Sequence, residues 1–194
     1  MNKMKVGIYI FDGVEVLDFA GPFEVFSRAT LKGQNLFEVF TIGKTNTQIN
    51  TYNNLKLIPE KSFSDALALD VLIVPGGSGI QKHELQDSNT LDWIKAQSKK
   101  VPVIASVCTG ALLLGACGLL NNKKATTHHE HLEELKSICP SVELVKNTPF
   151  VDQGNVLSSA GIATGIDLSL HLVARLFGEA VAVATAEKIA YKKS

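Results

Sequence analysis

The sequence predicts one α/β domain, a three-layer sandwich in which a mostly parallel β-sheet carries helices on both faces. Short apolar runs typical of strands alternate along the chain with longer runs of helical character. The strand-like runs are almost continuously apolar, which is typical of parallel strands buried on both faces. The 194 residues suit one domain, and the chain contains no internal repeat, low-complexity segment or long linker. We therefore expect a single domain over residues 1–194.

The first half of the chain supplies most of the regular pattern. We predict strands at residues 5–10, 37–42, 70–74 and 101–107, and a short strand or hairpin within 46–62. We predict helices at residues 19–30, 88–99 and 110–120. Pro22 is placed near the start of the first helix, where its missing N–H costs little, and Ser88 or Asn89 is expected to cap the second.

The second half of the chain is less regular. Strands are predicted at residues 142–145 and 156–158, a long helix at 165–177 ended by Gly178, and a final helix at 180–191. On that last long helix, Asp167 and His171 are one turn apart and are expected to form a hydrogen-bonded structural pair. Ligands of such folds bind at the carboxyl ends of the strands, so we expect the functional site there.

Composition excludes several classes of protein. Lys plus Arg equals Asp plus Glu at 19 each, which argues against a surface built for nucleic acid or for an anionic membrane. The uncharged residues 101–120 divide at Cys108 into a buried strand and a buried helix, so we predict no membrane span. Three cysteines without a C-x-x-C pair make a disulfide framework or a thiolate metal site a poor fit, and we expect a cytoplasmic protein.

Cys108 stands where a β-branched strand runs into a helix of small residues, in the sequence V-P-V-I-A-S-V-C-T-G-A. This pattern is typical of a nucleophile elbow, a tight turn that presents a side chain at the edge of the sheet. We expect the helix N-terminus to favour the thiolate, and the N–H of Thr109 to hold an oxyanion. The alternative is a small buried side chain without chemistry, which is our interpretation of Cys117 and Cys139.

Two further segments are predicted to lie at the same edge of the sheet. The glycine-rich turn after residues 70–74 lets backbone N–H groups approach a substrate, so Gly76 and Gly77 are expected to bind substrate, with Gly77 as a second oxyanion donor. The alternative is a plain flexible turn. Asp18 follows the first strand and would ordinarily cap the next helix. If its carboxylate instead reaches Cys108, it can act as a general acid and base.

Three histidines and three glutamates gather in residues 126–134, T-T-H-H-E-H-L-E-E. The zinc motif H-E-x-x-H is absent, because Glu133 occupies the position of its second histidine. We therefore interpret the segment as the start of a solvated helix and predict no metal site. His128 is kept as a candidate base that would pair with Cys108.

Four segments in order, F-D-G-V-E-V-L-D-F-A-G-P, V-P-G-G, V-C-T-G-A and A-T-T-H, resemble the ThiJ/PfpI superfamily over nearly the whole chain. The segment S-S-A-G-I-A-T-G-I-D-L-S-L-H-L-V resembles the branch that contains isonitrile hydratase and the amidotransferase-like domains of AraC-type regulators. The resemblance implies the flavodoxin-like fold of class I glutamine amidotransferases. It also implies a homodimer that acts on a small molecule without a cofactor.

The resemblance also implies roles for individual residues. Cys108 matches the nucleophile, Asp18 the acidic residue that hydrogen-bonds to it, and Thr109 a residue implicated in isonitrile hydration. Gly77 matches the backbone donor, and His128 matches the histidine near the cysteine in protease-like members. The leading hypothesis is hydration of an isonitrile to an N-substituted formamide. The alternatives are an amidase, protease or glyoxalase-like enzyme that uses the same cysteine, and a non-catalytic redox-sensing or ligand-binding domain.

Overall fold

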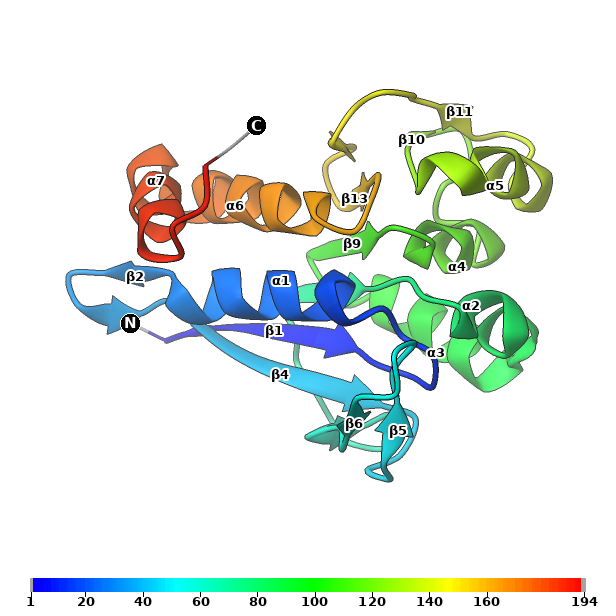
Figure 1. Cartoon of the computed structure of the whole chain (residues 1–194), viewed down its shortest axis with the longest axis horizontal. Helices are drawn as coiled ribbons and strands as arrows, with labels where there is room; N and C mark the ends of the chain where they lie inside the picture. The colour runs from blue at the N-terminus through cyan, green and yellow to red at the C-terminus, as the bar shows by residue number, and fades with distance from the viewer. Residues whose placement is uncertain (1, 193–194) are drawn as a thin grey trace.

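A seven-stranded sheet forms the centre of the computed structural model, which describes residues 2–192 (Figure 1). In spatial order its strands are β12 (Phe150–Asp152), β13 (Val156–Ser159), β9 (Val103–Val107), β8 (Val71–Val74), β1 (Met4–Tyr9), β4 (Phe37–Gly43) and β7 (Lys61–Ser62). Every neighbouring pair is parallel except β12 with β13. Every residue of β8 and β9 is buried, as expected of parallel strands covered on both faces.

Helices form a layer on each side of this sheet, so the predicted three-layer architecture is confirmed. One layer contains α1 (Val16–Arg28), α6 (Thr164–Phe177) and α7 (Glu179–Lys188), which pack on one another (Figure 1). The other contains α2 (Gly79–Lys82), the 3₁₀ helix η1 (Glu84–Gln86), α3 (Ser88–Ser98), α4 (Gly110–Ala116) and α5 (Leu132–Ile138). The chain crosses from β1 to β4 in one direction along the sheet, and later runs the opposite way, from β8 to β9 and β13. Crossovers between parallel strands share one hand, so crossovers in opposite directions place their helices on opposite faces of the sheet.

Three short strand pairs lie outside the main sheet. They are β2 (Thr30–Leu31) with β3 (Gln34–Asn35), β5 (Ile49–Asn50) with β6 (Lys56–Leu57), and β10 (Lys124–Ala125) with β11 (Glu143–Leu144). The β5–β6 pair confirms the hairpin expected within residues 46–62. The strand expected at residues 142–145 is present as β11, but it pairs only with β10.

Several helix boundaries differ from the prediction. Helix α1 begins at Val16, three residues early, so Pro22 lies inside the helix rather than near its start. The side chain of Asp87, not Ser88 or Asn89, caps α3 by accepting a hydrogen bond from the Asn89 N–H at 2.9 Å. Helix α4 ends at Ala116 instead of residue 120. The left-handed backbone of Gly118, with φ +75°, follows this end and turns the chain away.

The predicted pair of Asp167 and His171 on α6 is wrong. His171 Nε2 lies 2.7 Å from Asp152 Oδ2 on the edge strand β12, while Asp167 Oδ2 accepts a hydrogen bond from the Tyr191 hydroxyl at 3.0 Å. His171 therefore bonds to strand β12, and Asp167 bonds to the segment that follows α7. The helix end at Gly178 is confirmed, with φ +97° at that residue.

The order of the strands places a crevice where ligands bind in such folds. Strand β1 lies between β8 and β4, and the chain reverses its direction across the sheet at β1. The loops that follow the carboxyl ends of β1 and β8 therefore run in opposite directions and leave a crevice for a ligand. Among residues 2–192, no helix is both long enough and apolar enough to cross a membrane.

Candidate active site

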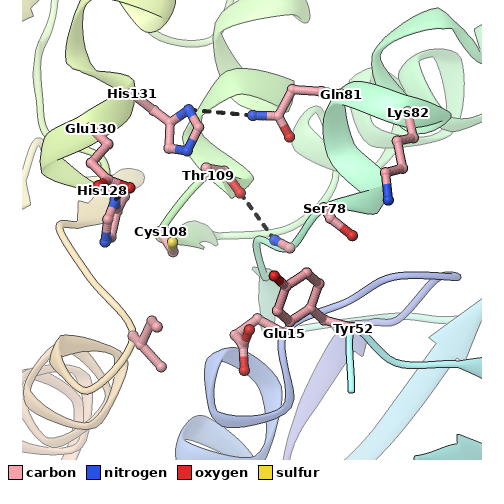
Figure 2. A pocket seen from close by; sticks show the side chains of 12 residues that line it. Glu15, Tyr52, Ser78, Gln81, Lys82, Cys108, Thr109, His128, Glu130 and His131 are labelled. Atoms are coloured by element: carbon pink, nitrogen blue, oxygen red, sulfur yellow. Dashed lines mark hydrogen bonds and ion pairs between the residues drawn. The ribbon is translucent and has the colours of Figure 1, made fainter. Parts of the chain in front are cut away.

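A cavity of about 420 Å³ opens at the carboxyl ends of β8 and β9 (Figure 2). Its wall includes Cys108 and Thr109 after β9, four residues after β8 (Gly77, Ser78, Gln81 and Lys82), and His128, Glu130 and His131. Glu15, Tyr52 and Ile162 complete it. This volume is in the range of small-molecule sites. The sequence thus predicted the correct edge of the sheet.

Cys108 is held in a left-handed turn between β9 and α4, with φ +55°. Its N–H donates to the Ser159 carbonyl at 3.1 Å, and its carbonyl accepts from the Thr127 hydroxyl at 2.8 Å. The close passage of α4 depends on Gly110, where a Cβ atom would lie 2.0 Å from the carbonyl oxygen of Val74. A non-glycine residue with positive φ at this place is the strained geometry of a nucleophile elbow.

Asp18 is the third residue of α1 and is completely buried. Its Oδ2 accepts a hydrogen bond from the Gly76 N–H at 3.0 Å, while its Oδ1 has no hydrogen-bond partner in the described part of the chain. Burial raises the pKa of Asp18 to about 7, against the lowering effect of the Gly76 N–H. The capping role belongs instead to Glu15, whose side chain accepts from the Val16 N–H. Asp18 is therefore a buried carboxyl group poised near neutrality.

The thiol of Cys108 carries its proton at neutral pH. Its side chain is largely buried, and this burial raises the pKa of Cys108 to about 12, with the charge of Asp18 as the second cause. The Thr109 backbone lowers this pKa, but by less than burial raises it. The N-terminus of α4 therefore favours the thiolate as expected, but burial and the charge of Asp18 outweigh this effect. The pair at the site is a neutral thiol coupled to a carboxyl group that can accept its proton.

The glycine turn after β8 holds the two polar side chains that accompany Cys108. The Gly76 N–H donates to Asp18, and the Gly77 N–H donates to Thr109 Oγ1 at 3.0 Å (Figure 2). The N–H that we expected Gly77 to offer to an oxyanion is thus already engaged. With its Oγ1 accepting from Gly77, Thr109 keeps its own hydroxyl proton to donate into the cavity that it lines. Substrate contact by Gly76 and Gly77 stays a prediction.

His128 lines the same cavity as Cys108, but no hydrogen bond joins the two among residues 2–192. Its Nδ1 lies 3.7 Å from Glu130 Oε2. Burial is the largest of the effects that lower the pKa of His128, so the imidazole is neutral at pH 7. The structure brings His128 to the site without forming the Cys–His pair that a protease-like mechanism uses, and its catalytic role stays a prediction.

The sequence did not reveal the apolar part of the cavity. Tyr52, on the β5–β6 hairpin, is 56% exposed, and Ile162, before α6, is 39% exposed. The hairpin reaches the site because the Tyr52 N–H donates to the Val14 carbonyl at 2.9 Å, which fixes it to the loop after β1. The only sign of this contact in the sequence is the aromatic residue Tyr52 in a predicted hairpin. Its hydrogen-bond partner, Val14, lies nearly forty residues earlier in the chain.

Cys117 and Cys139 have the structural roles expected of them, and all three cysteines are free. Cys117 Sγ donates to the Leu91 carbonyl at 3.5 Å, and Cys139 Sγ donates to Asn121 Oδ1 at 3.1 Å. Burial raises the pKa of Cys117 to about 11. Neither thiol lines the cavity of Cys108.

Comparison with known proteins gives concordant matches. The model of the DJ-1/PfpI family matches residues 4–175. The chain is 36% identical over 178 residues to isonitrile hydratase of Pseudomonas putida, covering 90% of this chain and 73% of that protein. It is 28% identical over 193 residues to the HTH-type transcriptional regulator GbdR of Pseudomonas aeruginosa, covering 99% of this chain and 52% of the regulator, so it spans about half of that protein. A crystal structure of a ThiJ/PfpI family protein from Pseudomonas syringae superposes with a TM-score of 0.88 at 25% identity, covering 100% of this chain and 77% of the other.

Proposed function

Because the chain belongs to the DJ-1/PfpI family, we propose that it is a cysteine-dependent enzyme that hydrates an isonitrile to an N-substituted formamide. The observation that carries the proposal is Cys108 in its left-handed turn beside the fully buried carboxyl group of Asp18, with the glycine turn after β8 holding Asp18 and Thr109 at the same place. The extensive identity with the P. putida hydratase supports the same choice of substrate class. Hydration of an isonitrile requires a nucleophile and a proton carrier, and these two residues supply both.

The first step forms a covalent thioimidate. The sulfur of Cys108 bonds to the terminal carbon of the isonitrile, and the lone pair of that carbon takes a proton. Asp18 accepts the thiol proton and delivers it to the carbon, giving R–N=CH–S–Cys108. Because the thiol has the higher pKa, its proton passes to Asp18 only as the sulfur–carbon bond forms, and the protonated carboxyl group then readily gives the proton to the carbon.

The second step releases the formamide. Asp18, ionised again, takes a proton from a water molecule whose oxygen adds to the thioimidate carbon. The carbon–sulfur bond then breaks, the nitrogen keeps one proton as R–NH–CHO, and the sulfur regains its proton. Thr109 donates its hydroxyl proton toward the substrate nitrogen or orients the water. The thiol, Asp18 and water balance the reaction, so this mechanism uses no cofactor.

The cavity favours an apolar substituent on the isonitrile. Tyr52 and Ile162 present exposed apolar surface beside the thiol. Burial of that surface by an alkyl or aryl group stabilises the complex by about 25 cal/mol for each Å² removed from water. We therefore expect cyclohexyl and benzyl isonitriles to be better substrates than charged isonitriles.

The test is formamide production from a panel of isonitriles by the wild type, Cys108→Ala and Asp18→Asn. Cys117→Ala serves as the matched control, because this cysteine lies outside the cavity. We expect full activity in the control, none in Cys108→Ala, and a loss of about 10²–10⁴-fold in Asp18→Asn, the usual contribution of general acid–base catalysis. A wild type inactive on every isonitrile, or a fully active Asp18→Asn, contradicts the proposal. A loss in His128→Ala as large as in Cys108→Ala favours amide or other carbonyl substrates instead.

A ligand-binding domain without turnover is the second candidate, because the chain aligns over nearly its whole length with the regulator GbdR. Redox sensing by Cys108 is the weaker form of this candidate, since oxidation proceeds through the thiolate and the pKa of Cys108 is about 12. A small molecule that raises the melting temperature of both the wild type and Cys108→Ala, without being converted by either, favours the ligand-binding domain.

A further inference from the structure

Three side chains with metal-binding atoms meet on one turn at the wall of the cavity. His128, Glu130 and His131 each offer one ligand atom, and these atoms lie within 4.8 Å of one another (Figure 2). The turn is the 3₁₀ helix η2 (His129–His131), in which the His131 N–H donates to the His128 carbonyl at 2.8 Å. His128 comes directly before this turn, and the centroids of the His128 and His131 rings lie 5.9 Å apart. The sequence predicted the start of a solvated helix and no metal site here, and the structure has a 3₁₀ turn at this place.

The surroundings of His131 fix its orientation. His131 Nδ1 lies 2.8 Å from Glu134 Oε2, and Gln81 Nε2 donates to that same oxygen at 3.2 Å. A carboxylate beside Nδ1 assigns the ring proton to that nitrogen and leaves the lone pair on Nε2 for a ligand. Imidazoles that bind metal ions are commonly held in this way by a carboxylate. Gln81 Nε2 also lies 3.3 Å from His131 Nδ1, so two side chains hold this ring in place.

We propose that His128, Glu130 and His131 bind a divalent transition-metal ion, such as Zn²⁺, Co²⁺ or Ni²⁺, at the wall of the Cys108 cavity. Ligand atoms around a tetrahedral zinc ion lie about 3.4 Å apart, so the cluster must contract slightly. Glu130 can make this adjustment because its side chain is 70% exposed. Two histidines and one carboxylate match the donor set of open metal sites, and they leave a coordination position free for a molecule in the cavity. The hydration mechanism does not use this ion, so the two proposals stand separately.

The experiment is titration of the untagged protein with Zn²⁺ by calorimetry, and with Co²⁺ by its d–d absorption. The variants are His128→Ala, His131→Ala and Glu134→Gln, with His129→Ala as the matched control from the same turn and Cys108→Ser to detect binding by the thiol. We expect one ion per chain, at least tenfold weaker binding in His128→Ala and His131→Ala, and about tenfold weaker binding in Glu134→Gln, as for loss of a carboxylate behind a metal-bound imidazole. His129→Ala and Cys108→Ser should bind as the wild type does.

Three outcomes overturn the proposal. They are no binding by the wild type at millimolar metal ion, equal binding by all histidine variants, and loss of binding only in Cys108→Ser. The altered histidine and glutamate side chains are exposed or half-buried, and Cys108→Ser exchanges one atom of a buried side chain, so the variants are expected to fold, and circular dichroism checks this before titration. Because no substrate is present, a failure of isonitrile turnover leaves the result of this experiment intact.

Discussion

Asp18 shows at the scale of one residue how this fold sets up chemistry. Its side chain is fully buried, one carboxyl oxygen has a single backbone donor, and the other has no partner in the described part of the chain. Burial therefore raises its pKa to about 7, where a carboxyl group both gives and takes protons. A strongly shifted acid beside a buried thiol is a feature of functional sites rather than of ordinary cores.

The pH dependence of turnover should follow Asp18. Its carboxylate form must accept the thiol proton, so we expect kcat/KM for isonitrile hydration to rise as the pH rises through about 7 and then to level off. The thiol itself adds no step below about 12. The measurement is the pH profile of kcat/KM. A rate that falls through pH 7 would show that the protonated acid is the form that starts the reaction.

Asp18 should also lower the stability of the protein at neutral and alkaline pH. Its folded pKa of about 7 lies above the ordinary value of 3.8, so the folded state binds more protons between these two values, and stability falls as the pH rises through that window. The full cost, at most about 4 kcal/mol, is present above pH 7. We expect Asp18→Asn to be more stable than the wild type at pH 8, with the difference vanishing near pH 4. Urea unfolding at both pH values checks this, and equal stability at pH 8 contradicts it.

The glycine turn after β8 acts at the scale of the element. Through its backbone it positions a helix residue, Asp18, and an elbow residue, Thr109, at the same time. A Cβ atom at Gly76 would lie 2.5 Å from Thr109 Oγ1, 2.6 Å from the Thr109 nitrogen and 2.9 Å from Asp18 Oδ2. No side chain therefore fits at Gly76 without displacing Thr109 or Asp18.

Gly76→Ala should consequently lower turnover by about 10²-fold in a protein that still folds. The added methyl group pushes apart Thr109 and Asp18, and displacements of about 1 Å cost about 10²-fold in rate. Gly161→Ala is the matched control, because it directly precedes Ile162 of the cavity wall but its Cβ would meet only His128 Cδ2, at 3.8 Å. The measurement is kcat with melting temperature for both variants. Equal activity of the two variants would mean that Gly76 is only a turn residue.

Much of the arrangement of elements was predictable from local signals, and the remainder was not. The apolar runs marked β1, β4, β8, β9 and β13, since buried parallel strands need continuous apolar sequence. The edge strand β12 was not predicted, because its three residues are only partly buried and show no clear alternation of apolar and polar side chains. Among the site residues, Cys108 was marked by its strand–turn–helix pattern. The state of its proton was not predictable, because burial depends on packing from distant segments.

At the scale of the whole molecule, the buried carboxylate of Glu84 joins segments that are far apart in the first half of the chain through an ion pair and hydrogen bonds. Glu84 is 2% exposed and lies 2.9 Å from Lys44 Nζ, while Tyr9 and Thr90 donate hydrogen bonds to its Oε2 at 2.5 and 2.7 Å. The network connects β1, the end of β4, η1 and α3. A buried carboxylate is tolerated only when its partners remain in place.

The homodimer implied by the family resemblance stays a prediction that sedimentation analysis can check.

Lys44→Met should therefore destabilise the protein far more than the loss of a surface ion pair does. It leaves Glu84 without its cation, and we expect the free energy of unfolding to fall by about 2–4 kcal/mol. Lys95→Met is the control, since its 3.9 Å pair with Asp92 is exposed and worth less than about 1 kcal/mol. Denaturant unfolding measures both variants. Similar losses would show that the Lys44–Glu84 pair contributes no more than a surface pair.

The parallel sheet places the start of β1 and the candidate active site at opposite ends of its strands. Strand β1 begins at Met4 on the edge opposite the cavity, and α7 packs near the end of α1, where Lys188 Nζ bonds to Thr30 Oγ1 (Figure 1). A tether attached before β1 would therefore hold the protein by the end of the sheet opposite the cavity. Immobilised on a resin or an electrode in this way, each molecule would present its cavity to the flowing solution.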